Sequence, residues 1–271
     1  MRHFSLLRFL PAAFLAPAFA VAATAARADD LVAHRASYIL SLAPDSGAAE
    51  GAGGDGLMVF ELKDACDGWA TDLKLRFTME GDNGESRTFD ASQVAWEAKD
   101  GSAYRFTIKN GFGDQQDQLR GEAKVDVSTG KAEATSDLPT KSQAELPNGT
   151  LFPLNHTRLL LKKAAEGETV VSAEYFDGTA STQAMQASAL IGAGEKDWPG
   201  LAKSFPALKG LTSYPIGLAF YLGDQTDATP DSEQFLRLYQ NGVMGAFTFS
   251  LGNVKIHATL DQLELEPPPT C

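Results

Sequence analysis

Apolar and polar residues alternate with period two over long stretches of the sequence, most clearly from Trp69 to Glu80. Successive side chains of a β-strand point to opposite faces, so this pattern predicts a strand with one buried and one wet face. Every second residue from Trp69 onward would lie on the buried face. Apart from Thr71 these residues are apolar: Trp69, Leu73, Leu75, Phe77 and Met79. A chain built from such segments favours a sheet over a helical bundle.

The same alternation recurs, less cleanly, along the rest of the chain. Turn signals such as Asn110-Gly111 and Asn241-Gly242 separate the alternating segments, as is typical of tight reversals between antiparallel strands. The sequence therefore predicts a mainly β fold with one continuous sheet, and two halves divided near a predicted helix over residues 154–165 remain the alternative. The further predicted strands lie around residues 36–42, 58–62, 104–108, 119–127, 216–222, 234–239, 243–251 and 254–265.

One segment breaks the strand pattern and predicts a helix over residues 154–165. Pro153 is suited to a first helical turn, and Gly167 stands where a helix would end. Leu159, Leu160 and Leu161 lie between these two signals, next to two lysines. The expected helix has about three turns and is the main exception to the β architecture.

The first 28 residues resemble an export signal. Arg2 and Arg8 precede an apolar run, and the small residues Ala26 and Ala28 flank Arg27 in a typical cleavage pattern. We expect cleavage after Ala28 and an exported domain over 29–271. An uncleaved membrane anchor is the alternative, although the apolar run is shorter than the ~20 residues that span a bilayer.

The formal net charge of −12 limits the classes of partner. An acidic surface repels phosphate backbones and anionic lipid heads. The composition therefore argues against nucleic acid as a partner, and no apolar stretch after Asp30 is long enough to embed the chain in a membrane.

The chain has two cysteines, Cys66 and the last residue, Cys271. Exported proteins fold in oxidising compartments, where a lone pair of thiols usually forms a structural disulfide. The spacing matches neither a redox motif nor a zinc site. We expect one bridge between them, with two free thiols as the alternative.

Motifs for catalysis, metals and cofactors are mostly absent. His34, His156 and His257 lack metal-ligand spacing, so we expect neither a metal nor another cofactor. Ser128 and Lys131 match a Ser-x-x-Lys pattern, but on a predicted turn instead of a helix. The many carboxylates leave a glycosidase-type pair open, because one sequence does not show which of them meet across a sheet.

Aromatic residues gather in the second half of the chain. On a strongly curved sheet such residues can line a cavity, and ordinary core packing is the alternative interpretation. The candidates for a cavity lining are Trp198, Phe205, Tyr214, Phe220 and Tyr239.

Seven short segments also occur, in this order, in a known family and span nearly all of the chain after the signal. They are Ala36–Leu42, Gly56–Phe60, Ala65–Trp69, Leu151–His156, Tyr175–Gly178, Arg237–Val243 and Pro268–Cys271. Together they resemble the EipB-type cell-envelope integrity proteins of alphaproteobacteria. The resemblance implies a periplasmic β-spiral, or half-open barrel, with a strongly bent, many-stranded antiparallel sheet. It also implies the Cys66–Cys271 disulfide and a role in envelope integrity, and it supplies no catalytic residue.

These observations favour a non-enzymatic, monomeric periplasmic protein that binds a peptide, another envelope protein or an apolar ligand on its curved sheet. A carrier of lipid or lipoprotein is the more specific alternative, in which the sheet shields acyl chains from water. A glycan hydrolase with paired carboxylates is a further alternative. A continuous apolar lining of the concave face would favour the lipid, whereas charges scattered across it would favour protein contact.

Overall fold

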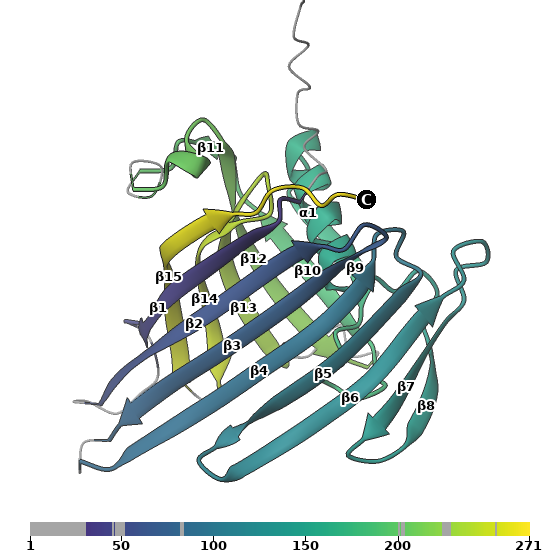
Figure 1. Ribbon diagram of the computed structural model, residues 1–271, viewed down its shortest axis with the longest axis horizontal. Helices are drawn as coiled ribbons and strands as arrows, with labels where there is room; N and C mark the ends of the chain where they lie inside the picture. Colours follow the sequence, from purple (N-terminus) through teal and green to yellow (C-terminus); the bar gives the residue numbers. More distant parts are fainter. Residues whose placement is uncertain are drawn as a thin grey trace, which may run out of the picture.

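The computed structural model describes residues 31–44, 46, 52–81, 84–199, 201, 204–223, 229–252 and 254–271. The predicted export signal over 1–28 lies outside these residues. Within them the chain forms strands almost throughout (Figure 1). The elements are β1 (His34–Leu42), β2 (Gly53–Asp64), β3 (Gly68–Glu80), β4 (Ser86–Ala98), β5 (Ala103–Phe112), β6 (Gln115–Val125), β7 (Ala132–Leu138), β8 (Ser142–Leu146), α1 (Pro153–Glu166), β9 (Val170–Tyr175), β10 (Met185–Ile191), β11 (Glu195–Lys196), the 3-10 helix η1 (Pro206–Leu208), β12 (Thr212–Leu222), β13 (Ser232–Tyr239), β14 (Met244–Leu251) and β15 (Val254–Leu265).

The described strands belong to one antiparallel sheet. Its order is β8-β7-β6-β5-β4-β3-β2-β1-β15-β14-β13-β12-β10-β9, and the short β11 pairs with β12. The first strand therefore lies in the middle of the sheet, beside the last one, and β8 and β9 are its two edges. The predicted fold class is confirmed: the structure is mainly β, with a strongly bent antiparallel sheet.

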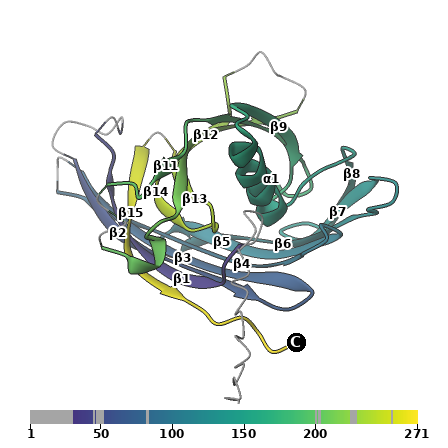
Figure 2. The same ribbon diagram turned by 90° about the horizontal axis from the view of Figure 1, so that it is seen from above.

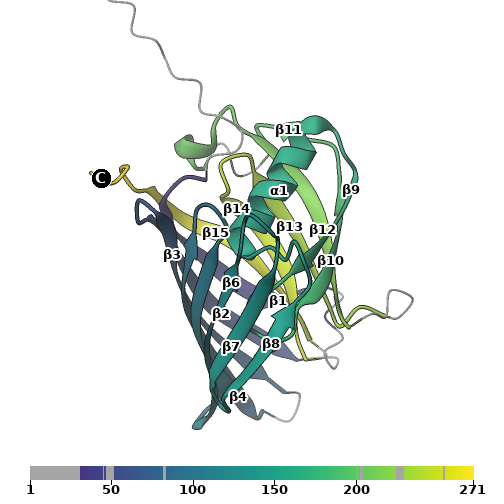
Figure 3. The same ribbon diagram turned by 90° about the vertical axis from the view of Figure 1, so that its right-hand side faces the viewer.

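The sheet curls round on itself without closing. Seen from above, its strands surround α1 (Figure 2). Figure 3 faces the side on which the edge strands β8 and β9 lie, with α1 beside β9. A single parallel bridge between Leu151 and Tyr175 links the segment before α1 to β9. The predicted half-open barrel is thus the observed arrangement, and its one α-helix lies within the curve of the sheet.

The alternating pattern divides the sheet into a concave and a convex face. Strand register places Leu75 opposite Met58, and Phe77 opposite Phe89, on the same face as Tyr38. Tyr38 and Phe77 are fully buried, whereas Arg76, which lies between Leu75 and Phe77 on β3 and points to the other face, is exposed. The apolar set recognised in the sequence therefore lines the concave face.

Helix α1 begins and ends at the residues that the sequence indicated. Pro153 occupies its first turn, and Gly167 ends it in the left-handed conformation with φ of 84°. Leu160, Leu161 and Ala164 are buried, so the helix packs one apolar stripe against the concave face. Among the described residues of the second half of the chain, the one further helical element is the short η1, which begins at Pro206.

Cys66 and Cys271 form the expected disulfide, with their Cα atoms 5.9 Å apart. Cys66 lies in the turn between β2 and β3, and Cys271 ends the tail that follows β15. Glu266 donates its backbone N–H to the carbonyl of Ala33, which keeps the start of that tail beside β1. The bridge therefore joins the C-terminus to the first arm of the sheet.

Candidate functional site: the concave face of the sheet

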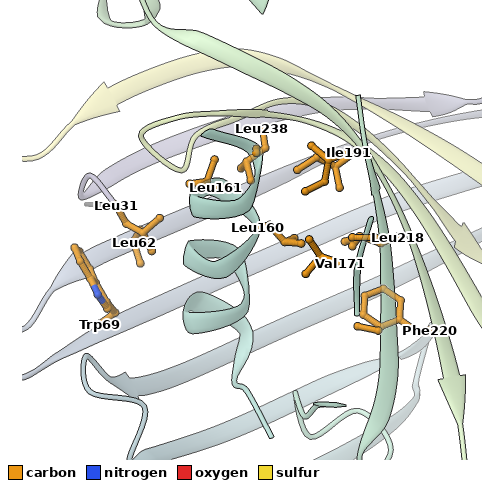
Figure 4. Packing of buried hydrophobic residues seen from close by; sticks show 14 of the residues in the cluster. Leu31, Leu62, Trp69, Leu160, Leu161, Val171, Ile191, Leu218, Phe220 and Leu238 are labelled. Carbon is orange, nitrogen blue, oxygen red and sulfur yellow. The ribbon is translucent and has the colours of Figure 1, made fainter. Parts of the chain in front are cut away.

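The part of the concave face beneath α1 is a closed apolar core. Leu160 and Leu161 of the helix pack with Val171 of β9 and Leu218 of β12, and Leu62 and Trp69 approach from β2 and β3 (Figure 4). Each of these side chains is buried. This part of the face is filled by the protein itself.

Beyond the helix the concave face continues with half-buried apolar side chains, which we call the aromatic rim. Phe77 and Tyr38 form its fully buried floor. The ring centroids of Tyr38 and Phe247 are 5.2 Å apart, and those of Phe247 and Phe249 are 5.9 Å apart. The rim consists of Leu42, Met79, Phe89, Phe247 and Phe249, each packed against the same core cluster.

Charged side chains leave this apolar lining largely uninterrupted. Glu97 is covered by α1, while Asp64, Arg87 and Asp117 lie close to the ends of their strands. Arg87 places its guanidinium 4.8 Å from the centroid of the Phe112 ring. The lining between the core beneath α1 and the rim is therefore uncharged, and Phe60 and Met244 pack against both clusters.

Glu97 is the most deeply buried carboxylate of the concave face, with 1% of its surface exposed. Its carboxylate accepts backbone N–H groups of Leu154 at 2.8 Å and Asn155 at 2.7 Å, and the Asn155 side-chain amide at 2.7 Å. Burial raises the pKa of Glu97 to about 7, although these hydrogen bonds oppose the shift. Glu97 thus binds the N-terminal amides of α1, which have no partner within the helix.

Other buried polar groups beside Glu97 also hold structure. The Tyr104 hydroxyl donates to the carbonyl of Asp177 at 3.2 Å and accepts from the Gln93 amide at 3.0 Å. Burial lowers the pKa of His156 to about 4, so this ring is neutral at physiological pH. Burial raises the pKa of the Asp177 carboxyl. We see in these contacts the support of α1 and its flanking turns.

The convex face carries a separate apolar groove of about 840 Å³. Leu190 on β10 and Phe235 on β13 border it, with 67% and 54% of their surfaces exposed. Trp198 forms one wall, and the Arg237 guanidinium lies 4.7 Å from its ring centroid. This groove lies on the opposite side of the sheet from the aromatic rim.

The five aromatic residues considered as a cavity lining occupy different surroundings. Phe220 and Tyr214 lie on the concave face within the core beneath α1. Tyr239 is buried on the other face of β13, and Phe205 packs against the cluster that contains it. Trp198 lines the convex groove. The structure therefore does not bring the five together on one surface.

Sequence reasoning missed both Glu97 and the aromatic rim. The rim gathers residues from β1, β3, β4 and β14, and only the strand order shows that they meet. Leu42, Met79, Phe247 and Phe249 lie in segments for which the alternation predicted strands, whereas Phe89 lies on β4, which it did not predict. Ser128 and Lys131 lie on the turn between β6 and β7, as expected.

Within the described part of the chain, no group of three or more histidine, cysteine, aspartate or glutamate side chains is arranged to hold a metal ion. No helix among the same residues is both long and apolar enough to cross a membrane. Both carboxylate oxygens of Glu97 are engaged by α1, so this residue does not offer a free carboxylate for glycan cleavage.

Comparison with known proteins agrees with this architecture. The chain is 28% identical over 257 residues to the "Cell envelope integrity protein EipB" of Brucella abortus. The matched region covers 93% of this chain and 90% of that protein. A crystal structure of a beta-barrel-like protein from Brucella abortus, from a domain family of unknown function, superposes with a TM-score of 0.77 at 25% identity. That match covers 88% of this chain and 99% of the other. The model of the family described as "EipB-like" matches residues 25–267, and the chain belongs to this family.

Proposed function

We propose that this protein is a non-enzymatic periplasmic protein that supports envelope integrity by binding the acyl chain of a lipid or lipoprotein on its concave face. One observation carries the proposal: the apolar lining continues without a charged interruption from the core beneath α1 to the aromatic rim. The sequence pattern of an export signal and the name of the relative support the compartment and the envelope role.

The exposure of the aromatic rim supports an apolar ligand. Each rim side chain keeps part of its apolar surface in contact with water, although it lies on the inward face of the sheet. Removing apolar surface from water is favourable by about 25 cal/mol per Å². Binding of an acyl chain along the rim is therefore favourable, and it requires no polar side chain to contact each methylene group.

The decisive experiment compares two phenylalanines on adjacent strands that point to opposite faces. Phe249 belongs to the aromatic rim, whereas Phe235 lies on the convex face, paired with the neighbouring Thr248. We expect Phe249→Ser to weaken binding of a dansyl-labelled fatty acid roughly tenfold or more, because a phenylalanine contributes about 1.5–3 kcal/mol on burial. Phe235→Ser should leave the affinity unchanged. Fluorescence titration measures both.

Two results would contradict the proposal. The first is failure of the purified exported chain to bind the labelled fatty acid at all. The second is loss of binding in Phe235→Ser with full binding in Phe249→Ser, which would move the ligand to the convex groove. Native mass spectrometry of protein isolated from its own periplasm then identifies the natural ligand by its mass.

A further inference from the structure

We infer that α1 is a displaceable plug of the ligand-binding face, held at its N-terminal end by Glu97, and that an acyl ligand displaces it to reach the core beneath. The inference rests on the proposed function and adds how the site is regulated. It also assigns a positioning role to Glu97, through the helix that Glu97 holds.

The first observation is the place of α1 in the chain and in the sheet. The helix connects β8 and β9, which are the two edges of the sheet, so its movement breaks no pairing between neighbouring strands of the sheet. The single bridge between Leu151 and Tyr175 lies just before the helix and ties its entry to β9. Gly149 before it and Gly167 after it have φ of 80° and 84°. Both glycines adopt left-handed backbone conformations that other residues avoid. The chain therefore turns sharply between β8 and α1 and again between α1 and β9.

The second observation is that polar anchoring of the helix is concentrated at its N-terminus. The residue before the first turn, Phe152, provides no side-chain cap. Glu97 takes that role from β4, and the Asn155 amide also donates to the carbonyl of Ala98 at 3.3 Å. Arg158 donates to the carbonyl of Lys99 at 3.1 Å. These anchors all come from the end of β4 and the residue after it.

The third observation is what lies beneath the helix. Ala187 and Ala189 of β10 are fully or almost fully buried, and their small side chains leave room for a cylinder against the sheet. On β12 the inward residues Ile216, Leu218 and Phe220 continue to Leu222, which is 38% exposed at the strand's end. Displacing α1 would therefore expose an apolar strip that leads away from the helix along the concave face.

The energetics require the ligand to replace what the helix provides. Without ligand, an outward α1 would leave Leu160, Leu161 and the strip beneath them in water, so the docked state dominates. A ligand shifts such an equilibrium only by its differential affinity for the two states. An acyl chain has this property, because it covers the strip that the departing helix uncovers.

Hydrogen exchange on the full exported chain tests the anchor. Asn155→Ala removes the side-chain contacts, and Glu97→Gln replaces one of the two acceptor oxygens with an NH2 group, which cannot accept a hydrogen bond from a helix amide. We expect amides of α1 to exchange roughly fivefold faster in each variant, because one hydrogen bond contributes about 1 kcal/mol. Amides of β3 and β4 should keep their rates. The matched controls are Asn148→Ala and Glu133→Gln, both at exposed positions.

Exchange with ligand tests the displacement and needs no substitution, so it does not depend on a variant that folds. Saturating labelled fatty acid should speed exchange in α1 of the natural sequence while protecting the rim strands β3 and β14. Binding that leaves α1 exchange unchanged or slows it overturns the plug and leaves the proposed function intact. Absence of binding overturns the proposed function instead. Unchanged α1 exchange in both anchor variants overturns the role of Glu97.

Discussion

Glu97 shows how one residue can connect a strand to a helix that lies more than fifty positions away in the chain. Its carboxylate is buried because it must reach the amides of Leu154 and Asn155 from within the curve of the sheet. Burial penalises the charged form, and the helix amides reduce that penalty without removing it. Ionisation of Glu97 near neutral pH is therefore less favourable in the folded protein than in the unfolded chain.

This ionisation gives a pH dependence with a definite sign. The pKa of Glu97 rises from 4.5 to about 7 in the folded protein, so its stabilising contribution is complete below pH 4.5 and is lost as the pH rises through 7. Relative to Glu97→Gln, the natural protein should lose about 3 kcal/mol of unfolding free energy across this range. Urea unfolding of both proteins at a series of pH values measures the difference. A constant difference between them would show that Glu97 titrates normally.

At the scale of elements, the alternation of apolar and polar residues predicted nine of the fifteen strands that the structure describes and missed β4, β7, β8, β9, β10 and β11. On β7 and β10 the inward positions hold small residues, among them Ala132 and Ala134 of β7 and Ala187 and Ala189 of β10. Alanine gives little contrast with a polar neighbour and has a low strand propensity, so no period-two signal stands out. Tertiary packing explains these small residues on β10, since α1 lies against them.

The site was predictable to a smaller extent than the elements. Inward apolar positions could be read strand by strand, but the placement of Leu42 and Phe249 on either side of Ile256 depends on β1 pairing with β15. The contact of Glu97 with α1 depends on the depth of the curve. Neither depends on local sequence, because long-range pairing and curvature determine both.

The turn after β9 offers a test at the scale of one element. Gly178 has φ of 80°, and an added Cβ would approach the buried Phe106 ring to 2.4 Å, a contact without counterpart at Gly149, which has the same φ. We expect Gly178→Ala to lower the unfolding free energy by roughly 2–5 kcal/mol, from the strained backbone and overpacking together. Gly149→Ala should cost about 1–2 kcal/mol. Equal effects in thermal melts would argue against close packing of this turn on β5.

For the whole molecule, the covalent link of greatest span is the Cys66–Cys271 bridge, across a sequence separation of 205 residues. Replacing both cysteines with serine should cost about 2–5 kcal/mol, as is typical for native disulfides. It should also make the tail after Leu265 the first site of proteolysis, because that tail leaves the sheet there. Thermal melts and limited proteolysis, with and without reductant, measure these effects. Identical melts of the variant and the oxidised protein would show that the bridge is dispensable.

The pairing of β1 with β15 sets the order in which the fold can be completed. During synthesis β1 emerges long before β15, so these two strands can pair only after nearly the whole chain has been made. Pairings between such distant parts of a chain slow folding. A chain that ended before β15 would accordingly lose a strand from the middle of the sheet and not from its edge. The strands β1–β8 would then no longer be paired with the strands β9–β14.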